Sequence, residues 1–263
     1  MALHQHQRIR HEVMRRTLDV RRVERLTPHM QRITFGGPEL HGFHSAAPDD
    51  HVKLFFPNRD GRLVLPTLGP NGPEYPAGLE PSPMRDYTPR RHDAARGELD
   101  IDFVLHGDGP AARWATQARP GQQIGAGGPR GSFLVADDFQ RYVLVGDETA
   151  LPAIGRWLCE MPAGMRAVTL VEIPAADRQP LPSRAEVERI WLERDGDDPA
   201  ASTRLEQALR ALPDLAGDTF YWIAAESRRA RGMRQWLDQE RDVPKDWIKA
   251  SGYWKAHPDD VDD

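Results

Sequence analysis

The hydrophobic pattern of the chain changes near residue 141, and this change constrains the fold more than any other feature. Upstream, residues 99–105 alternate apolar and polar side chains, which predicts a strand with one buried face. Downstream, residues 142–145 form a continuous apolar run that ends at Gly146, as expected for a strand buried on both faces. The two patterns predict an α+β chain of two domains, an antiparallel β domain followed by an α/β domain.

The first half carries further short alternating runs, separated by turn residues. These predict strands at residues 18–26, 30–35, 51–56 and 85–90. Five or six strands in about 120 residues are typical of a small antiparallel β-barrel. The segment 66–83 is rich in glycine and proline, so we expect an irregular loop there.

The second half alternates apolar runs with helical patterns. Strands are expected at residues 167–173, 189–192, 220–224 and near 247–254, and a helix at 150–160. Thr203 and Glu206 form a capping-box pattern before one helix, and Ser227 is placed to cap another. This alternation predicts a mainly parallel sheet, whose ligands bind beyond the carboxyl ends of the strands. We therefore predict an antiparallel β-barrel domain at 15–138 and an α/β nucleotide-binding domain at 139–263.

Charge and composition narrow the class of function. The 263 residues carry a formal net charge of −5, which argues against a general binder of nucleic acid or of anionic membranes. No apolar run has the length of a secretory signal or a membrane span, so we expect a cytoplasmic protein. We also expect a monomer. The single cysteine, Cys159, excludes an internal disulfide and a cysteine-ligated iron–sulfur cluster. The histidines are spaced too irregularly to predict a metal site.

Residues 84–90 hold an arginine, a tyrosine and a threonine at positions that can face one ligand. On an extended strand Arg85 and Tyr87 share a face, and Thr88 lies beside them. A guanidinium offers a planar fork to phosphate oxygens and a tyrosine ring offers a stacking surface, so the pattern suits a flavin. The alternative is a solvated loop with an exposed arginine and an aromatic ring that packs on the core.

Three glycine-rich turns are candidates for ligand binding. Residues 106–114 follow the clearest strand and open a helix, where free amides near Gly109 could hold a pyrophosphate. A plain strand-to-helix turn is the alternative. Residues 127–133 contain Arg130, which is either a solvated charge or a ligand-facing cation. Residues 146–152 follow the first buried strand, where a dinucleotide phosphate would bind, but they lack the full G-x-G-x-x-G fingerprint.

These motifs become specific through their combination and order. The segments are Arg85-Asp86-Tyr87-Thr88, residues 102–115, Gly128-Pro129-Arg130-Gly131-Ser132, residues 146–152 and Gly252-Tyr253-Trp254-Lys255. Together they resemble the siderophore-interacting protein family, a branch of the ferredoxin reductase superfamily, from about residue 21 to residue 257. The resemblance implies an N-terminal β-barrel that binds FAD and a C-terminal α/β domain that binds NADH or NADPH. It also implies reduction of ferric siderophores in the cytoplasm.

The resemblance further implies roles for individual residues. Arg85 would contact the FAD pyrophosphate, and Tyr87 and Thr88 are the catalytic candidates because they would stack on the isoalloxazine and lie near flavin N5. The other cofactor-binding candidates are Asp102, Phe103, Val104, His106, Gly109, Ala111, Ala112, Ser132, Asp147, Thr149 and Ala150. Lys53, Arg130 and Lys255 match cations that attract the anionic siderophore. Lys255 stands where many relatives have arginine, so the charge is kept but the bidentate fork is lost.

We interpret the chain as an FAD-containing, NAD(P)H-dependent ferric-siderophore reductase, since a flavin converts a two-electron donor into one-electron steps for iron. Two alternatives stay open: a flavin-dependent reductase of another acceptor, and a siderophore-binding flavoprotein reduced by a partner such as ferredoxin. Coenzyme preference also stays open. Glu172 could accept from a ribose diol and favour NADH, whereas Arg178 or the arginines between residues 228 and 234 could serve a 2'-phosphate.

Overall fold

The computed structural model describes residues 4–69, 72–107, 109–213 and 217–256. Two compact units divide the chain between them. The first unit is His6–Val135, and the second runs from Ala136 onward and includes the preceding residues His4 and Gln5. The chain therefore contributes to the second unit twice, once through its first described residues and once through its second half.

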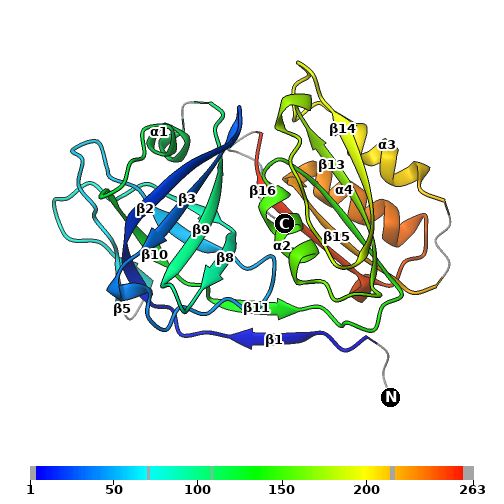
Figure 1. Ribbon diagram of the computed structural model, residues 1–263, viewed down its shortest axis with the longest axis horizontal. Helices are drawn as coiled ribbons and strands as arrows, with labels where there is room; N and C mark the ends of the chain where they lie inside the picture. The colour runs from blue at the N-terminus through cyan, green and yellow to red at the C-terminus, as the bar shows by residue number, and fades with distance from the viewer. Residues whose placement is uncertain (1–3, 70–71, 108, 214–216, 257–263) are drawn as a thin grey trace. The chain divides into compact units, whose positions relative to one another are not determined.

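The first unit is built on a curled antiparallel sheet (Figure 1). Its seven strands lie in the order β7-β4-β10-β2-β3-β9-β8. They are β2 (Arg15–Thr27), β3 (Met30–Gly36), β4 (Val52–Phe55), β7 (Met84–Tyr87), β8 (Pro89–Asp93), β9 (Glu98–Val104) and β10 (Gln123–Gly127). The alternation in β9 buries Leu99, Ile101 and Phe103 completely within one apolar core. The antiparallel β class predicted for the first half is confirmed.

Smaller elements complete the first unit. Strand β1 (Gln7–Arg10) pairs with β11 (Gly131–Leu134), a 3-10 turn η1 spans Pro38–Leu40, and helix α1 spans Pro110–Thr116. Strands β5 (Thr67–Gly69) and β6 (Gly72–Glu74) form a hairpin inside the segment expected to be irregular. That expectation was wrong in part, because residues 67–69 pair with residues 72–74, and Gly72 has a φ of 123° that favours glycine.

The second unit contains a five-stranded parallel sheet. Its strands are β12 (Arg141–Asp147), β13 (Arg166–Ile173), β14 (Glu186–Glu193), β15 (Thr219–Glu226) and β16 (Ile248–Trp254), in the order β14-β13-β12-β15-β16. The predicted parallel sheet is confirmed. The strand order reverses at β12, since β13 and β14 extend from one side of it and β15 and β16 from the other. In such sheets ligands bind at the carboxyl ends of the strands beside the reversal.

Helices cover both faces of this sheet. Helices α3 (Arg204–Ala211) and α4 (Ser227–Gln239) pack on the face that carries Val143 and Val145. Helix α2 (Leu151–Glu160) lies on the opposite face, where the ring of Trp157 is 6.1 Å from that of Tyr142. Successive side chains of β12 point to opposite faces of the sheet. Because helices cover both faces, every position in the middle of β12 is buried, which explains the continuous apolar run. Short 3-10 turns occur at Ala175–Asp177 and Lys245–Trp247. No helix in the described ranges has both the length and the apolar character of a membrane span.

The N-terminus of α3 differs from the predicted capping box. Thr203 is the N-cap residue, but its hydroxyl accepts from Gln207 Nε2 at 2.9 Å and caps no backbone amide. Glu206 binds the guanidinium of Arg229 at 2.9 Å instead of reaching back to Thr203. A buried arginine outside the local sequence therefore outcompetes the local cap.

The N-terminus of α4 is capped by Glu226 and not by Ser227. Glu226 Oε2 accepts from the backbone amides of Arg228 at 2.7 Å and Arg229 at 3.1 Å. Ser227 is the first helical residue, and its hydroxyl donates to the carbonyl of Trp254 at 3.1 Å. The prediction of Ser227 as the cap was wrong because its hydroxyl donates to a carbonyl of β16, the strand that pairs with β15.

Candidate functional site

Strand β7 places Arg85 and Tyr87 on the same side, as their alternate spacing predicts. Their partners across the β4–β7 ladder are Leu54 and Val52. Arg85 is exposed, and its Nη1 donates to the carbonyl of Met84 at 2.7 Å. Among the described residues, no other group accepts from this guanidinium. A planar cation with most of its donors uncommitted fits the pyrophosphate of FAD.

Tyr87 packs on the core of the first unit. Its ring centroid is 4.5 Å from that of Phe103 and 6.3 Å from that of Phe56. Burial raises the pKa of the Tyr87 phenol, and the charge of Arg85 opposes this only in part, so the hydroxyl stays protonated. Thr88 follows directly and is buried. The structure brings Arg85, Tyr87 and Thr88 together, and their flavin roles remain predictions.

Asp102 and Phe103 of β9 are engaged within the protein. Asp102 Oδ1 accepts from Arg32 Nε at 2.7 Å and Oδ2 from Arg32 Nη2 at 2.8 Å. Phe103 is fully buried. Both side chains are thus satisfied by the fold itself. Cofactor contact at these positions, as predicted, would have to come from the backbone.

The segment after β9 is more open. The predicted residues there differ in exposure: His106 and Gly109 are exposed, Val104 and Ala112 are half-buried, and Ala111 is buried. Helix α1 starts immediately after Gly109, and Pro110 occupies its first position. The amides of this first turn therefore follow an exposed glycine, as a pyrophosphate site would require.

Ser132 holds neighbouring loops onto β11. Its buried hydroxyl donates to Asp50 Oδ2 at 2.6 Å and lies 2.7 Å from His11 Nε2. It also accepts from the amide of Ala46 at 3.3 Å. These contacts saturate the hydroxyl, so the geometry favours a structural role for the Ser132 side chain over the predicted cofactor contact.

A cavity of about 220 Å³ in the first unit gathers several basic side chains. Its lining includes Arg15, His51, Lys53 and Arg130, with apolar walls from Phe55, Met84 and Pro66 and with Tyr75 beside the β5–β6 hairpin. Lys53 Nζ is 2.9 Å from Asp86 Oδ1, and Arg130 is exposed. Two of the three predicted substrate cations, Lys53 and Arg130, thus share one cavity. Lys255, which is exposed, belongs to the second unit.

Asp147 ends β12, at the carboxyl edge where the strand order reverses. Its Oδ1 accepts from the amide of Thr149 at 2.9 Å and from the hydroxyl of Thr149 at 2.5 Å, and its Oδ2 accepts from the indole N–H of Trp254 at 2.8 Å. Burial, and then the charge of the adjacent Glu148, raise the pKa of Asp147 to about 6. Both oxygens already have donors, so the geometry does not favour the predicted direct contact between Asp147 and a coenzyme.

The turn after β12 is compact. Gly146 is required because a Cβ at this position would lie 2.7 Å from the carbonyl of Ala224 and would overlap Ala150. Ala150 is fully buried and is the N-cap residue of α2, and no side chain caps the first amides of this helix. Thr149 is half-buried beside it. Uncapped amides at the carboxyl edge suit the phosphate of a dinucleotide, as predicted for this turn.

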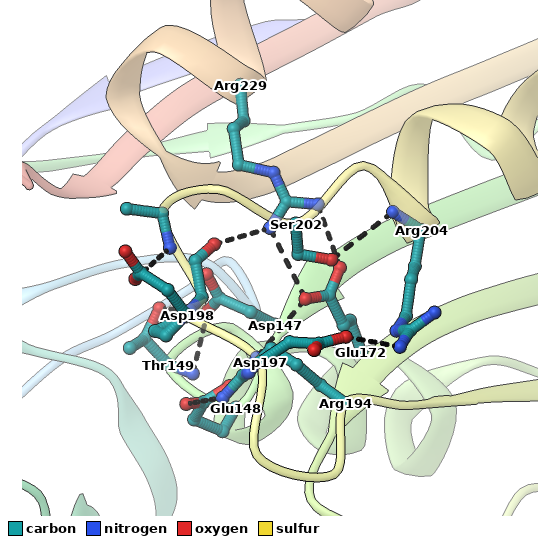
Figure 2. A network of polar contacts seen from close by, with 12 residues as sticks. Asp147, Glu148, Thr149, Glu172, Arg194, Asp197, Asp198, Ser202, Arg204 and Arg229 are labelled. Atoms are coloured by element: carbon teal, nitrogen blue, oxygen red, sulfur yellow. Dashed lines mark hydrogen bonds and ion pairs between the residues drawn. The ribbon is translucent and has the colours of Figure 1, made fainter.

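Glu172 is the second-last residue of β13 and is fully buried between two arginines (Figure 2). Its Oε2 is 2.8 Å from Arg229 Nη2, and its Oε1 is 3.3 Å from Arg194 Nη1. Each arginine also binds a second acid, Arg194 with Glu148 at 2.6 Å and Arg229 with Glu206 at 2.9 Å. Burial alone would raise the pKa of Glu172. The hydrogen bond and charge of Arg229, the hydrogen bond of Ser202 and the charge of Arg194 outweigh burial and lower this pKa.

This network bears on the open question of coenzyme preference. Glu172 is committed to the arginines and is not available to a ribose diol, which argues against the interpretation that favoured NADH. Arg229 is committed in the same way, and Arg178 pairs with Glu193 at 2.7 Å. Arg228, Arg231 and Arg234 are exposed on α4.

The sequence did not predict that Trp254 and Arg194 lie at the carboxyl edge of the parallel sheet. For Trp254 the position at the end of a predicted strand, within a recognised motif, could have indicated it. Arg194 carried no signal, because its partners Glu148 and Glu172 become neighbours only when β12, β13 and β14 align.

Two family models match consecutive parts of the chain. The siderophore-interacting FAD-binding domain matches residues 19–133, and the siderophore-interacting protein model matches residues 139–257. The chain belongs to the siderophore-interacting protein family. This confirms the family predicted from the five motifs, together with the FAD-binding character of its first half.

Full-length relatives and a solved structure agree with this assignment. An NADPH-dependent ferric-chelate reductase of Escherichia coli is 37% identical over 254 residues, which cover 95% of this chain and 96% of the relative. A ferric vibriobactin reductase of Vibrio cholerae is 32% identical over 245 residues, covering 91% and 89%. The crystal structure of a siderophore utilization protein from T. fusca has a TM-score of 0.90 at 35% identity and covers 98% of this chain and 99% of that one. The predicted two-part α+β fold is confirmed.

Proposed function

We propose that the protein uses NAD(P)H and FAD to reduce ferric siderophores, with release of ferrous iron. One observation supports the proposal: the cation-lined cavity and β7, the strand predicted to contact FAD, belong to the same strand pair. Lys53 of β4 lines the cavity, and its ammonium is 2.9 Å from Asp86, which lies between Arg85 and Tyr87 on β7. Lys53, Arg130 and Arg15 give this cavity a local positive charge that attracts an anionic chelate.

The residues of the first unit have distinct tasks in this reaction. FAD, when bound, would supply the chemistry that couples a two-electron donor to a one-electron acceptor. Arg85 would hold the pyrophosphate with its planar fork, and Tyr87 would orient the ring system. Lys53 and Arg130 would offset the negative charge of the chelate. The ferric chelate is the substrate, so reduction requires no protein ligand to iron.

We propose that residues 15–138 bind FAD and residues 139–263 bind the coenzyme, with NADPH as the preferred donor. Glu172, the acid that could read a ribose diol, is buried against Arg229 and Arg194. The Escherichia coli relative is named as NADPH-dependent. The uncapped start of α2, beside Thr149 and Ala150, would receive a coenzyme phosphate.

We further propose that the protein is a cytoplasmic monomer. The cytoplasm supplies NADPH, and the proposed sites need no residue from a second copy. Size-exclusion chromatography with light scattering and cell fractionation test these two statements. A stable dimer or a membrane-associated fraction would contradict them.

Anaerobic rapid mixing tests the reaction itself. NADPH should bleach the flavin absorbance of the purified protein faster than NADH does, and a ferric siderophore should then restore it while a ferrous chelator reports iron release. Bleaching without reoxidation by any ferric chelate, but with reoxidation by quinones, would favour a reductase of another acceptor. Bleaching by reduced ferredoxin alone would favour the partner-reduced flavoprotein.

A further inference from the structure

Trp254 links two strands that are not neighbours. It ends β16, Asp147 ends β12, and β15 lies between these strands in the sheet. The indole N–H of Trp254 donates to Asp147 Oδ2 at 2.8 Å. The side chain therefore crosses the carboxyl end of β15, at the reversal of strand order where a parallel sheet of this kind binds its ligand.

A bulge in β16 aims Trp254 across the sheet. The register between β15 and β16 shifts at their carboxyl ends, so that Tyr253 is an extra residue between the paired Gly252 and Trp254. Such a bulge re-aims the side chain that follows it. A Cβ at Gly252 would overlap Ser227, whose hydroxyl also holds the carbonyl of Trp254 at 3.1 Å. The backbone before and at Trp254 is thus held by these contacts in addition to the hydrogen bond of its indole.

The carboxylate of Asp147, which accepts the hydrogen bond from this indole, costs free energy to bury. The Asp147 side chain is 1% exposed, and its described hydrogen-bond partners are all neutral groups. An ionised carboxylate in this setting is destabilising, which is why burial raises its pKa. In return it provides a charge-assisted hydrogen bond, which is stronger and more directional than a neutral one. Perturbed carboxyl groups of this kind gather at functional sites.

We propose that Asp147 is a positioning residue for the coenzyme: it fixes the indole of Trp254 across the strand-order reversal, so that the ring is a rigid wall of the NAD(P)H site. This inference rests on the proposed function. It replaces the direct coenzyme contact first predicted for Asp147 with an indirect one. Without the hydrogen bond the indole can rotate, and coenzyme binding then has to order it.

Three variants and one control test this role: Asp147→Asn, Trp254→Phe, the double variant, and Trp236→Phe on α4. Asparagine keeps one acceptor oxygen, but its NH2 group then faces one of the N–H or O–H donors that Asp147 accepts from. Calorimetric titration of the FAD-loaded proteins with NADP+ and NAD+ measures affinity without turnover. We expect about tenfold weaker NADP+ binding in each single variant, from loss of one hydrogen bond to a charged group. The double variant should be no weaker than Trp254→Phe, and the control should match the wild type.

Hydrogen–deuterium exchange over residues 248–256 provides a second readout that needs no coenzyme. Asp147→Asn should exchange faster there than the wild type does. Additive losses in the double variant would overturn the proposal, because Asp147 would then act independently of Trp254. Faster exchange with unchanged NADP+ affinity would also overturn it, since the contact would be structural only. If Asp147→Asn does not fold, Trp254→Phe alone decides, and unchanged affinity refutes the role. A wild-type protein that binds neither nucleotide would instead refute the proposed function itself.

Discussion

The carboxylate of Glu172 and the guanidinium of Arg229 form an ion pair of 2.8 Å in which the two side chains are 0% and 6% exposed. The pair joins the carboxyl end of β13 to the first turn of α4, and Arg229 continues to Glu206 of α3 at 2.9 Å. One guanidinium therefore ties a strand to both helices on one face of the sheet. Because this contact is buried, removal of Arg229 leaves the carboxylate of Glu172 in the interior with Arg194 as its remaining counter-charge and takes the buried partner from Glu206.

Arg229→Met should destabilise the second unit by about 3–5 kcal/mol, the usual cost of breaking a buried ion pair from one side. Urea unfolding followed by tryptophan fluorescence measures this loss. The control Arg231→Met lies on the same helix but is exposed, so we expect a change within about 0.5 kcal/mol. Equal losses in both variants would show that the Glu172 contact contributes nothing specific.

Asp147 lowers the free energy of unfolding as pH rises, whereas a carboxyl group with a depressed pKa in the folded state raises it. Its pKa is about 6 in the folded protein against an ordinary value of 3.8, so the folded state binds more protons between these values. The contribution of this group to stability therefore falls as pH rises from about 4 to about 6. Asp147→Asn lacks this titration, and its melting temperature relative to the wild type should rise across that window and then level off. A difference that is constant with pH would contradict the shifted pKa.

His4 should stabilise the second unit most at acidic pH. Its Nδ1 is 2.7 Å from Asp138 and its Nε2 is 3.0 Å from Asp218, and only a protonated imidazole donates from both nitrogens. Burial alone lowers the pKa of His4, but the hydrogen bonds and charges of the two aspartates outweigh burial and raise it above 6.5. The stabilisation is therefore complete below about pH 6.5 and is lost as pH rises through the folded-state pKa.

His4→Gln should accordingly lower the melting temperature more at pH 6 than at clearly alkaline pH. Asp138→Asn should show the same trend, since it removes one of the two partners. Melting curves across the pH range measure both effects. A deficit that stays equal at all pH values would mean that the neutral imidazole already makes the full contribution.

Local sequence patterns predicted the strands well and the side-chain partners poorly, for a physical reason. Alternation in residues 99–105 depends only on which face is buried, so it can be read without knowledge of the neighbours. The partner of Asp102 is Arg32, 70 residues away, and the contact exists because β3 and β9 pair in one register. Ser227 shows the same limit, since its hydroxyl is taken by β16 and not by its own helix. The composition of a site thus follows from topology that local patterns do not contain.

Arg85→Ala should lose most of the bound FAD while the fold remains intact. The side chain is exposed, and within the described ranges it donates only to the adjacent carbonyl of Met84, so its removal breaks no tertiary contact. Flavin absorbance per protein after dialysis measures occupancy, and circular dichroism checks the fold. Arg59→Ala, which removes an arginine whose side chain is 91% exposed in the same unit, should retain FAD. Full occupancy in Arg85→Ala would exclude this residue as a phosphate ligand.

Replacing Lys53, Arg130 and Lys255 with alanine should raise the apparent KM for an anionic ferric siderophore and flatten its dependence on salt. In the proposed function these cations would steer the chelate through exposed charge, and such steering is screened within about 10 Å at 0.1 M salt. The rate of flavin reduction by NADPH should change little, because the residues act on the acceptor. Lys53 is paired with Asp86, so its single variant should have a smaller effect than Arg130→Ala.

A matched triple variant controls for the loss of three positive charges. Arg59, Arg184 and Lys245 are exposed cations that do not line the cavity, and their replacement by alanine lowers the net charge equally. Steady-state reduction of one anionic ferric siderophore at low and high salt compares the two triples. If both triples raise KM to the same extent, overall charge controls the encounter and the cavity has no special part in it. If replacing Lys53, Arg130 and Lys255 leaves the low-salt kinetics unchanged, the acceptor binds elsewhere, and the protein would be a flavin-dependent reductase whose acceptor site is not this cavity.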